Sequence, residues 1–244
     1  MITQVLADLR AESQELDDLV AAQQDWTIPT PATGWTIAHQ IAHLMWTDRA
    51  AILAITDPEG FQAQPLTPDL VDKTAEEGTK DPKLLTSWRE AREELASKLE
   101  TTQGKIVWFG PPMSPTSMAT ARLMETWAHG QDVADALKIE RKPTDRLKHV
   151  AHLGVRTIGF AFLLNGKTPP TEEVRVELIG PNGDLWTWGP EDAANRITGP
   201  ALDFCFLVTQ RRNRKELNLQ AQGPVAEEWM PIAQAFAGPP GGGR

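Results

Sequence analysis

Residues 118–137 read MATARLMETWAHGQDVADAL, and the rest of the chain can be organised around this stretch. Its apolar residues recur at helical spacing, and Glu125 and His129 stand four positions apart, so an α-helix places both side chains on one face. A carboxylate and an imidazole are two of the three protein ligands that an open divalent-metal site usually takes. The stretch therefore predicts a helix that contributes part of a metal site.

A second helical stretch, TIAHQIAHLMW over 36–46, carries His39 and His43, again four positions apart. Either histidine can supply a third ligand. The sequence spacing does not choose between them, since only the fold can bring this stretch to Glu125. We favour His43, which is surrounded by apolar neighbours, and expect His39 to support the site or to lie partly exposed. The spacing of Glu125 and His129 also suits a surface ion pair, but a carboxylate on an apolar sector costs several kcal/mol unless it is paired or coordinated.

The patterns around these stretches predict a helix bundle. Apolar residues at intervals of three and four indicate long helices over 2–24 and 33–56, and Asp-Pro at 81–82 and Ser-Pro at 114–115 are start signals for two more. Side chains on facing helices of such a bundle can assemble a metal site in its core.

The pattern changes after about residue 140. We expect one apolar helix over 147–164, then a hairpin of VRVELIG and LWTWG around Asn182-Gly183, and further short strands and helices. The fold class is thus an α-helical bundle followed by a small α+β domain. The expected divisions are a bundle over 1–142, a linking helix with the α+β domain over 143–238, and a disordered tail over 239–244.

The composition narrows the class of partner and the compartment. Lys and Arg number 24 against 33 Asp and Glu, a net charge of -9 that argues against nucleic acid or an anionic membrane as the main partner. No stretch reaches the ~20 apolar residues of a membrane span, and early acidic residues do not fit a signal peptide, so we expect a cytoplasmic protein. The lone Cys205 cannot form an internal disulfide and is expected to be a buried, inert thiol. A monomer and a homodimer both remain open.

The segments GWTIAHQIAHLMWTDRA and ARLMETWAHGQDVADAL together resemble the metal-binding N-terminal domain of mycothiol-dependent maleylpyruvate isomerases. These proteins are a branch of the DinB-like four-helix bundles, and an uncharacterised branch also shares the C-terminal pattern GPALDF-x-x-LVT-x-R. The resemblance implies a divalent metal, zinc before nickel or iron, held by His43, Glu125 and His129. It also matches Asp132 to an aspartate of the family motif, which can orient His129 or form a helix-surface salt bridge.

The resemblance further implies the chemistry and its partners. The metal would hold mycothiol, a small-molecule thiol, as a thiolate that attacks a small electrophilic substrate in an isomerase or S-transferase reaction. Arg211 matches a functional arginine of the family and could hold a carboxylate of substrate or thiol; the alternative is a solvated basic helix end, which the helix dipole favours. Gln210 stands where the family has glycine. The alternatives are a non-catalytic metal-binding or ligand-sensing protein and a metal-dependent hydrolase.

Overall fold

The chain divides into two compact units, Met1–Arg141 and Lys142–Arg244, in a computed structural model that describes residues 2–241 and 243. The first unit is helical and the second combines helices with a small sheet. The prediction of a helix bundle followed by a small α+β domain is confirmed.

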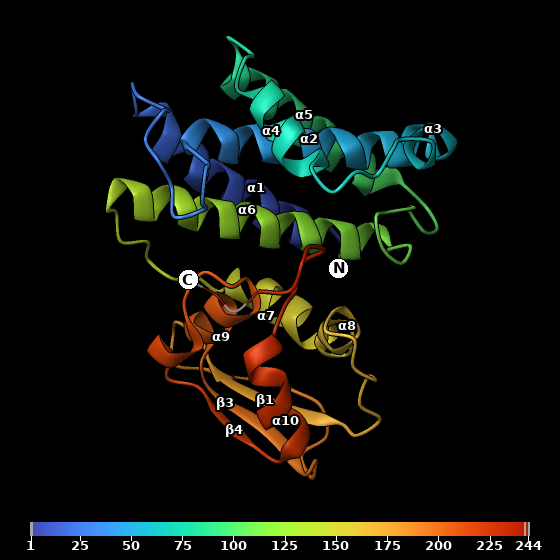
Figure 1. Cartoon of the computed structure of the whole chain (residues 1–244), viewed down its shortest axis with the longest axis vertical. Coiled ribbons are helices and arrows are strands. Elements are labelled where there is room, and N and C mark those ends of the chain that lie inside the picture. Colours follow the sequence, from blue (N-terminus) through green and yellow to red (C-terminus); the bar gives the residue numbers. More distant parts are fainter. Residues whose placement is uncertain (1, 242, 244) are drawn as a thin grey trace. The chain divides into compact units, whose positions relative to one another are not determined.

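Four long helices build the first unit within the described residues (Figure 1). Helix α1 packs on α6, while α2 packs on both α5 and α6. Their facing sides bury an apolar core that includes Leu16, Ile41, Leu44, Trp88 and Val133. The helices of this unit are α1 (Ile2–Ala21), α2 (Ile37–Thr56), α3 (Pro58–Gln62), α4 (Leu70–Gly78), α5 (Leu84–Thr101) and α6 (Pro115–Leu137).

Local side-chain contacts decide where the long helices begin. The prediction for α6 is confirmed, because Ser114 Oγ accepts a hydrogen bond from the backbone N–H of Ser117 (3.1 Å) and Pro115 follows it. The start expected at Thr33 is wrong. Gly34 adopts φ +80°, and the N-cap of α2 is Thr36. The signal at Asp81 marks a turn before α5, in which the carboxylate accepts from the backbone N–H of Lys83.

The second unit contains a four-stranded sheet with the order β2-β1-β3-β4. The predicted hairpin is confirmed, with β1 and β2 antiparallel, whereas β1 and β3 are parallel. Helix α9 packs on β1, β3 and α7, and α10 packs on β3 and β4. The elements are α7 (Leu147–Arg156), α8 (Ile158–Leu164), β1 (Val174–Ile179), β2 (Leu185–Trp188), β3 (Asn195–Pro200), α9 (Ala201–Val208), β4 (Gln220–Gln222) and α10 (Pro224–Trp229).

The single helix expected over 147–164 is wrong, because the chain breaks at Thr157 into α7 and α8. At this break the Thr157 hydroxyl donates to the carbonyl oxygens of Leu153 and Gly154. The tail expected to be disordered includes residues 242 and 244, which lie outside the described residues.

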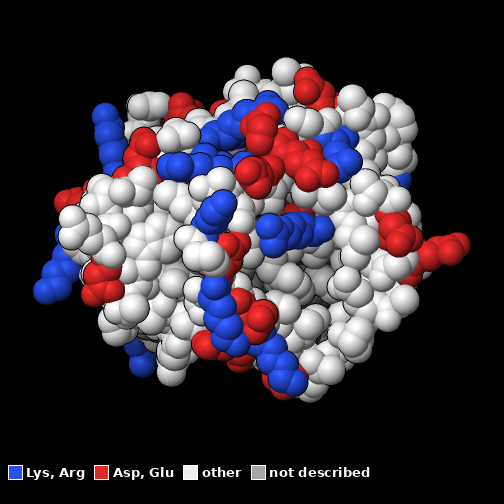
Figure 2. Space-filling model, turned by 90° about the horizontal axis from the view of Figure 1, so that it is seen from above, with Lys and Arg blue, Asp and Glu red and all other residues white. Residues whose placement is uncertain are grey.

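Charged side chains of both signs lie next to one another on the face shown in Figure 2. Separately from that view, the first unit contains close pairs of Lys80 with Glu77 (2.8 Å) and of Lys73 with Asp69 (2.8 Å). Among the described residues, no helix is long and apolar enough to cross a membrane. Cys205 is buried, and this burial raises the pKa of its thiol.

Candidate metal centre

His43, Glu125 and His129 converge in the first unit, although α2 and α6 carry them far apart in the sequence. Each offers a ligand atom, and these atoms lie within 4.8 Å of one another. Glu125 Oε2 is 3.2 Å from His129 Nε2 and 3.9 Å from His43 Nε2. Ligand atoms bound to one tetrahedral zinc lie about 3.3 Å apart, so the donor set and its spacing fit a divalent ion.

The Glu125 carboxyl stays ionised in this setting. Burial raises its pKa, but the hydrogen bond and the charge of His129 outweigh that effect and lower the pKa to about 2. Arg122 and His43 add smaller effects in the same direction. Glu125 is therefore an anionic oxygen ligand at neutral pH, flanked by two imidazoles that are both buried.

Two tryptophans border the three residues. The ring centroid of Trp35 lies 5.4 Å from that of His43 and 6.0 Å from that of His129, on which it stacks. Trp46 lies 5.9 Å from His43 on the same helix and stacks in turn on Phe109. Such rings restrict the imidazoles and limit the access of water, which strengthens charge interactions at the centre.

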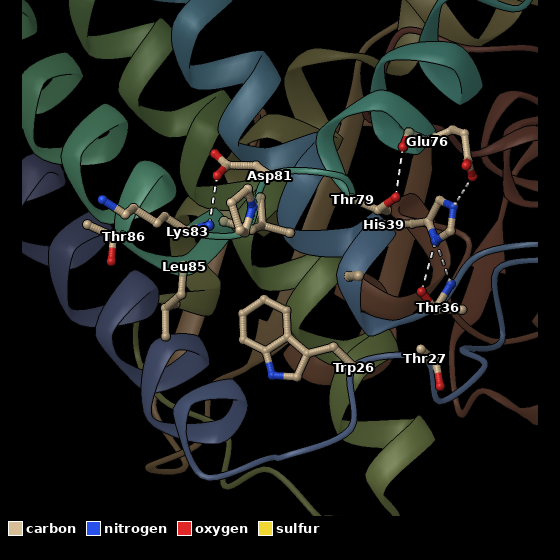
Figure 3. Close-up of a pocket in the computed structure, with 13 residues that line it drawn as sticks. Trp26, Thr27, Thr36, His39, Glu76, Thr79, Asp81, Lys83, Leu85 and Thr86 are labelled. Atoms are coloured by element: carbon tan, nitrogen blue, oxygen red, sulfur yellow. Dashed lines mark hydrogen bonds and ion pairs between the residues drawn. The ribbon is translucent and has the colours of Figure 1, made fainter.

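His39 lies outside this group, in a pocket of about 680 Å³ beside α2, α4 and the start of α5 (Figure 3). Its Nδ1 contacts the Thr36 hydroxyl (2.8 Å) and accepts from the Thr36 backbone N–H (3.2 Å), which completes the cap of α2. Its Nε2 contacts Glu76 at 3.0 Å. Both ring nitrogens are thus engaged in holding the start of α2 against α4, which agrees with the choice of His43 as the candidate ligand.

Two residues that the sequence did not single out interact with the candidate ligands, Gln40 with His129 and Arg122 with Glu125. Gln40 is buried, and its Oε1 contacts His129 Nδ1. Arg122, one turn before Glu125, donates to Asp48 (3.0 Å) and to the Thr47 hydroxyl (2.5 Å) inside the bundle. Their only signal in the sequence is position, since Gln40 precedes His43 by one turn and Arg122 precedes Glu125 by one turn.

The region that holds these residues also matches a known family. Residues 9–134 match the model described as the mycothiol maleylpyruvate isomerase N-terminal domain, which is just over half of the chain. The chain belongs to the mycothiol maleylpyruvate isomerase family. All three candidate ligands fall inside the matched residues.

Relatives and solved structures agree with this membership. Two uncharacterised proteins, from two strains of Mycobacterium tuberculosis, are each 57% identical over 250 residues, covering 98% of this chain and 97% of the relative. A crystal structure of the mycothiol-dependent maleylpyruvate isomerase has a TM-score of 0.61 at 14% identity and covers 85% of this chain and 88% of its own. That of a histidine-to-alanine variant has a TM-score of 0.63 at 14% identity, covering 93% and 96%. At this identity the structures show a shared fold, a DinB-like bundle with an α+β domain.

The second unit carries a separate, shorter match. Residues 170–220 match a model described as wyosine base formation; the match covers β1, β2, β3 and α9, ends at the first residue of β4, and leaves out the helices α7, α8 and α10. This segment is about a fifth of the chain, so the family membership rests on the first unit.

Arg211 and Gln210 lie in the second unit, directly after α9. Gln210 adopts φ +57°, a left-handed conformation that glycine enters without strain, so the backbone here suits the glycine that the resemblance implies at this position. Its side-chain amide donates to the carbonyl oxygens of Ala233 (3.3 Å) and Gly241 (3.0 Å). The Arg211 guanidinium donates to the Thr209 carbonyl oxygen (2.6 Å). Asp132 is buried on α6, in the first unit.

Proposed function

We propose that this protein is a divalent-metal-dependent enzyme that uses mycothiol, or a thiol of the same kind, to isomerise a small electrophile or to transfer the thiol onto it. The observation that carries the proposal is the convergence of His43, Glu125 and His129 within 4.8 Å, inside the part of the chain that matches the isomerase family. Zinc is the metal that this nitrogen and oxygen donor set suits first, with nickel and iron as alternatives.

Each side chain of the candidate centre has a separate role in this proposal, set by its charge and its position. Glu125 supplies one negative charge, and the two imidazoles supply neutral nitrogen donors, so the three residues hold a divalent ion and leave it with net positive charge. A metal held there supplies a Lewis acid that lowers the pKa of a bound thiol. Trp35 and Trp46 restrict the approach to His43 and keep the imidazoles in place. In the second unit, we assign to Arg211 the binding of a carboxylate of substrate or thiol.

Metal content tests the ligand assignment. We expect about one divalent ion per chain in wild-type protein and loss of most of it in His43→Ala, Glu125→Gln and His129→Ala, measured by mass spectrometry of the metal after gel filtration. His39→Ala is the matched control, because His39 is on the same helix but is bonded to Thr36 and Glu76. Retention of metal in the three ligand variants would refute the assignment.

Activity separates the enzyme from a metal-binding or ligand-sensing protein of the same fold. Metal-loaded wild-type protein should consume mycothiol in the presence of an electrophile, or isomerise a cis-enoic acid such as maleylpyruvate in a thiol-dependent manner, and Glu125→Gln should lose this activity by roughly 100-fold or more. Tight thiol binding in calorimetry with no turnover of any electrophile would instead support the sensing protein.

A further inference from the structure

Gln40 is a fully buried amide, 0% exposed, that joins the candidate metal centre to the loop before α2. Its Nε2 lies 2.8 Å from Thr30 Oγ1, and its Oε1 contacts His129 Nδ1 on α6. Both ends of the amide are therefore bonded, as buried polar groups require. The direction of these bonds carries information about the imidazole.

The Trp35 carbonyl oxygen sets which atom donates and which accepts in the series Trp35, Thr30, Gln40 and His129. The backbone carbonyl oxygen of Trp35 can only accept, so the Thr30 hydroxyl, 3.0 Å away, donates its single hydrogen to it. Thr30 Oγ1 must then accept from Gln40, which places the amide nitrogen of Gln40 toward Thr30. The amide oxygen consequently faces His129, and because this oxygen can only accept, His129 Nδ1 carries the hydrogen.

This order of bonds determines what His129 presents to Glu125. A neutral imidazole with its hydrogen on Nδ1 has a lone pair on Nε2. That atom lies 3.2 Å from Glu125 Oε2, and without a metal a hydrogen bond between the two helps to lower the pKa of Glu125. With a metal in place of that hydrogen, both atoms can turn a lone pair toward the same cation. Two such atoms facing the same space are suited to share a cation.

We propose that Gln40 is a positioning residue that holds His129 in the tautomer with Nε2 free to bind a metal. The inference rests on the proposed metal site and adds how that site is kept ready. Gln40 touches neither substrate nor metal and acts through His129 alone, so its loss lowers metal affinity while the three ligands remain.

The loop from Thr30 to Trp35 holds the hydroxyl to which Gln40 donates. The backbone N–H of Thr30 donates to the Trp35 carbonyl oxygen (2.8 Å), and that of Trp35 donates to the Ala32 carbonyl oxygen (2.9 Å), so the loop is closed on itself. The ring of Trp35 stacks on His129 with its centroid 6.0 Å away. Trp35 thus holds His129 in two ways. Its ring stacks on the imidazole, and its carbonyl oxygen orients the Thr30 hydroxyl, which orients Gln40.

Substitutions at residue 40 separate the hydrogen bond from mere packing. Gln40→Leu keeps the size of the side chain but removes the acceptor, and should weaken zinc binding by about 10- to 100-fold. Gln40→Glu restores an acceptor for Nδ1 and should regain wild-type affinity or better. Thr30→Val leaves the amide free to rotate and should give an intermediate loss. Gln131→Leu is the matched control, since this buried amide bonds to Asp135 (2.8 Å) and should leave the affinity within twofold of wild type.

Two readouts decide the proposal on the full-length chain. Chelator competition gives the zinc affinity of each variant, and nitrogen NMR of the zinc-loaded protein reports which ring nitrogen of His129 carries hydrogen. Hydrogen on Nδ1 together with rescue by Gln40→Glu supports the proposal. Hydrogen on Nε2, or equal loss of affinity in Gln40→Leu and Gln40→Glu, overturns it.

The same data distinguish failure of this inference from failure of the proposed function. If wild-type protein binds no zinc, nickel or iron, the metal site itself is wrong and the role of Gln40 falls with it. If wild type binds metal and Gln40→Leu binds it equally well, the metal site stands and only the positioning role is lost. Circular dichroism of each variant excludes a loss of affinity that comes from unfolding.

Discussion

Arg122 and Asp48 form an ion pair inside the bundle, one helical turn from Glu125. Burial raises the pKa of Asp48, and the charge of Arg122 with its hydrogen bond opposes that rise. The arginine is 3% exposed, so neither partner gains much from water. The pair is therefore coupled, and each residue depends on the other for its charge to be tolerated.

Removing one partner of this pair should cost far more than removing both. We expect Arg122→Met to lower the free energy of unfolding by about 3–5 kcal/mol, because it leaves the Asp48 carboxyl buried without its cation. The double variant Arg122→Met with Asp48→Leu should recover most of that loss. Urea unfolding followed by circular dichroism measures both, and additive losses in the double variant would contradict the coupling.

The sequence could predict the candidate ligands but not the residues that orient them. Histidine and glutamate are metal-capable types, and their spacing of four on apolar helices placed His129 and Glu125 on one face before any fold was known. Gln40 is not a ligand type, and its bond to His129 crosses 89 residues of sequence. Only the packing of α2 against α6 brings the two together.

At the scale of elements, α1 and α5 are joined by a buried carboxylate. Asp17 on α1 pairs with Arg89 at 2.5 Å and with Arg92 at 2.8 Å, both on α5. Burial raises the pKa of Asp17, but the hydrogen bond from Arg89 and the charges of both arginines outweigh this effect and lower the pKa below its ordinary value. The unfolded chain therefore binds this proton more readily than the folded one.

Acid should weaken this tie. Its contribution to stability is fully present above the ordinary carboxyl pKa of about 3.9 and is lost as the pH falls through the lower folded value. We expect Asp17→Asn to be less stable than wild type at pH 7 and to lose less stability between about pH 5 and 2. Urea midpoints across that range measure this. Asp18→Asn, at an exposed neighbour, should keep the wild-type acid dependence.

Helices α7 and α9 approach closely at Gly154. A Cβ atom there would lie 2.7 Å from Val208 Cγ1 and 3.0 Å from Phe204 Cε1, closer than side chains pack. Gly154→Ala should therefore lower the free energy of unfolding by about 1–3 kcal/mol, despite the better helix propensity of alanine. Gly159→Ala, whose Cβ would meet Pro169 at an ordinary 3.6 Å, should be neutral or stabilising. Thermal unfolding compares the two, and equal effects would argue against the steric reason.

Element type was easier to predict than element boundaries. Apolar periodicity and the Asn-Gly turn gave the long helices and the hairpin, because those signals are local. The break at Thr157 has no local signal, because Thr47 makes the same hydroxyl bond to the preceding turn inside the unbroken helix α2. The parallel pairing of β1 with β3 depends on contacts such as Val176 with Ile197, which no local pattern specifies.

At the scale of the molecule, the chain separates its candidate ligands from its second unit. His43, Glu125 and His129 all belong to Met1–Arg141, and so do Gln40 and Thr30. The first unit also has its own apolar core. The metal site should therefore be a property of the helix bundle, while Arg211 belongs to the other unit.

A fragment of residues 1–141 tests that separation. We expect it to be helical and to bind about one divalent ion with affinity within tenfold of the full chain, as measured by chelator competition, but to lack thiol-dependent activity. A fragment that is folded by circular dichroism and yet binds no metal would mean that the second unit supplies part of the site. His129→Ala in the same fragment is the control for adventitious metal.

The sheet of the second unit has its shortest strands at its edges. Strands β2 and β4 have four and three residues, while the inner strands β1 and β3 have six each. An edge strand exposes unpaired backbone groups to which a strand of another molecule can add, and short edges offer few of them. We therefore expect the short edge strands β2 and β4 to disfavour edge-to-edge aggregation when the protein is concentrated.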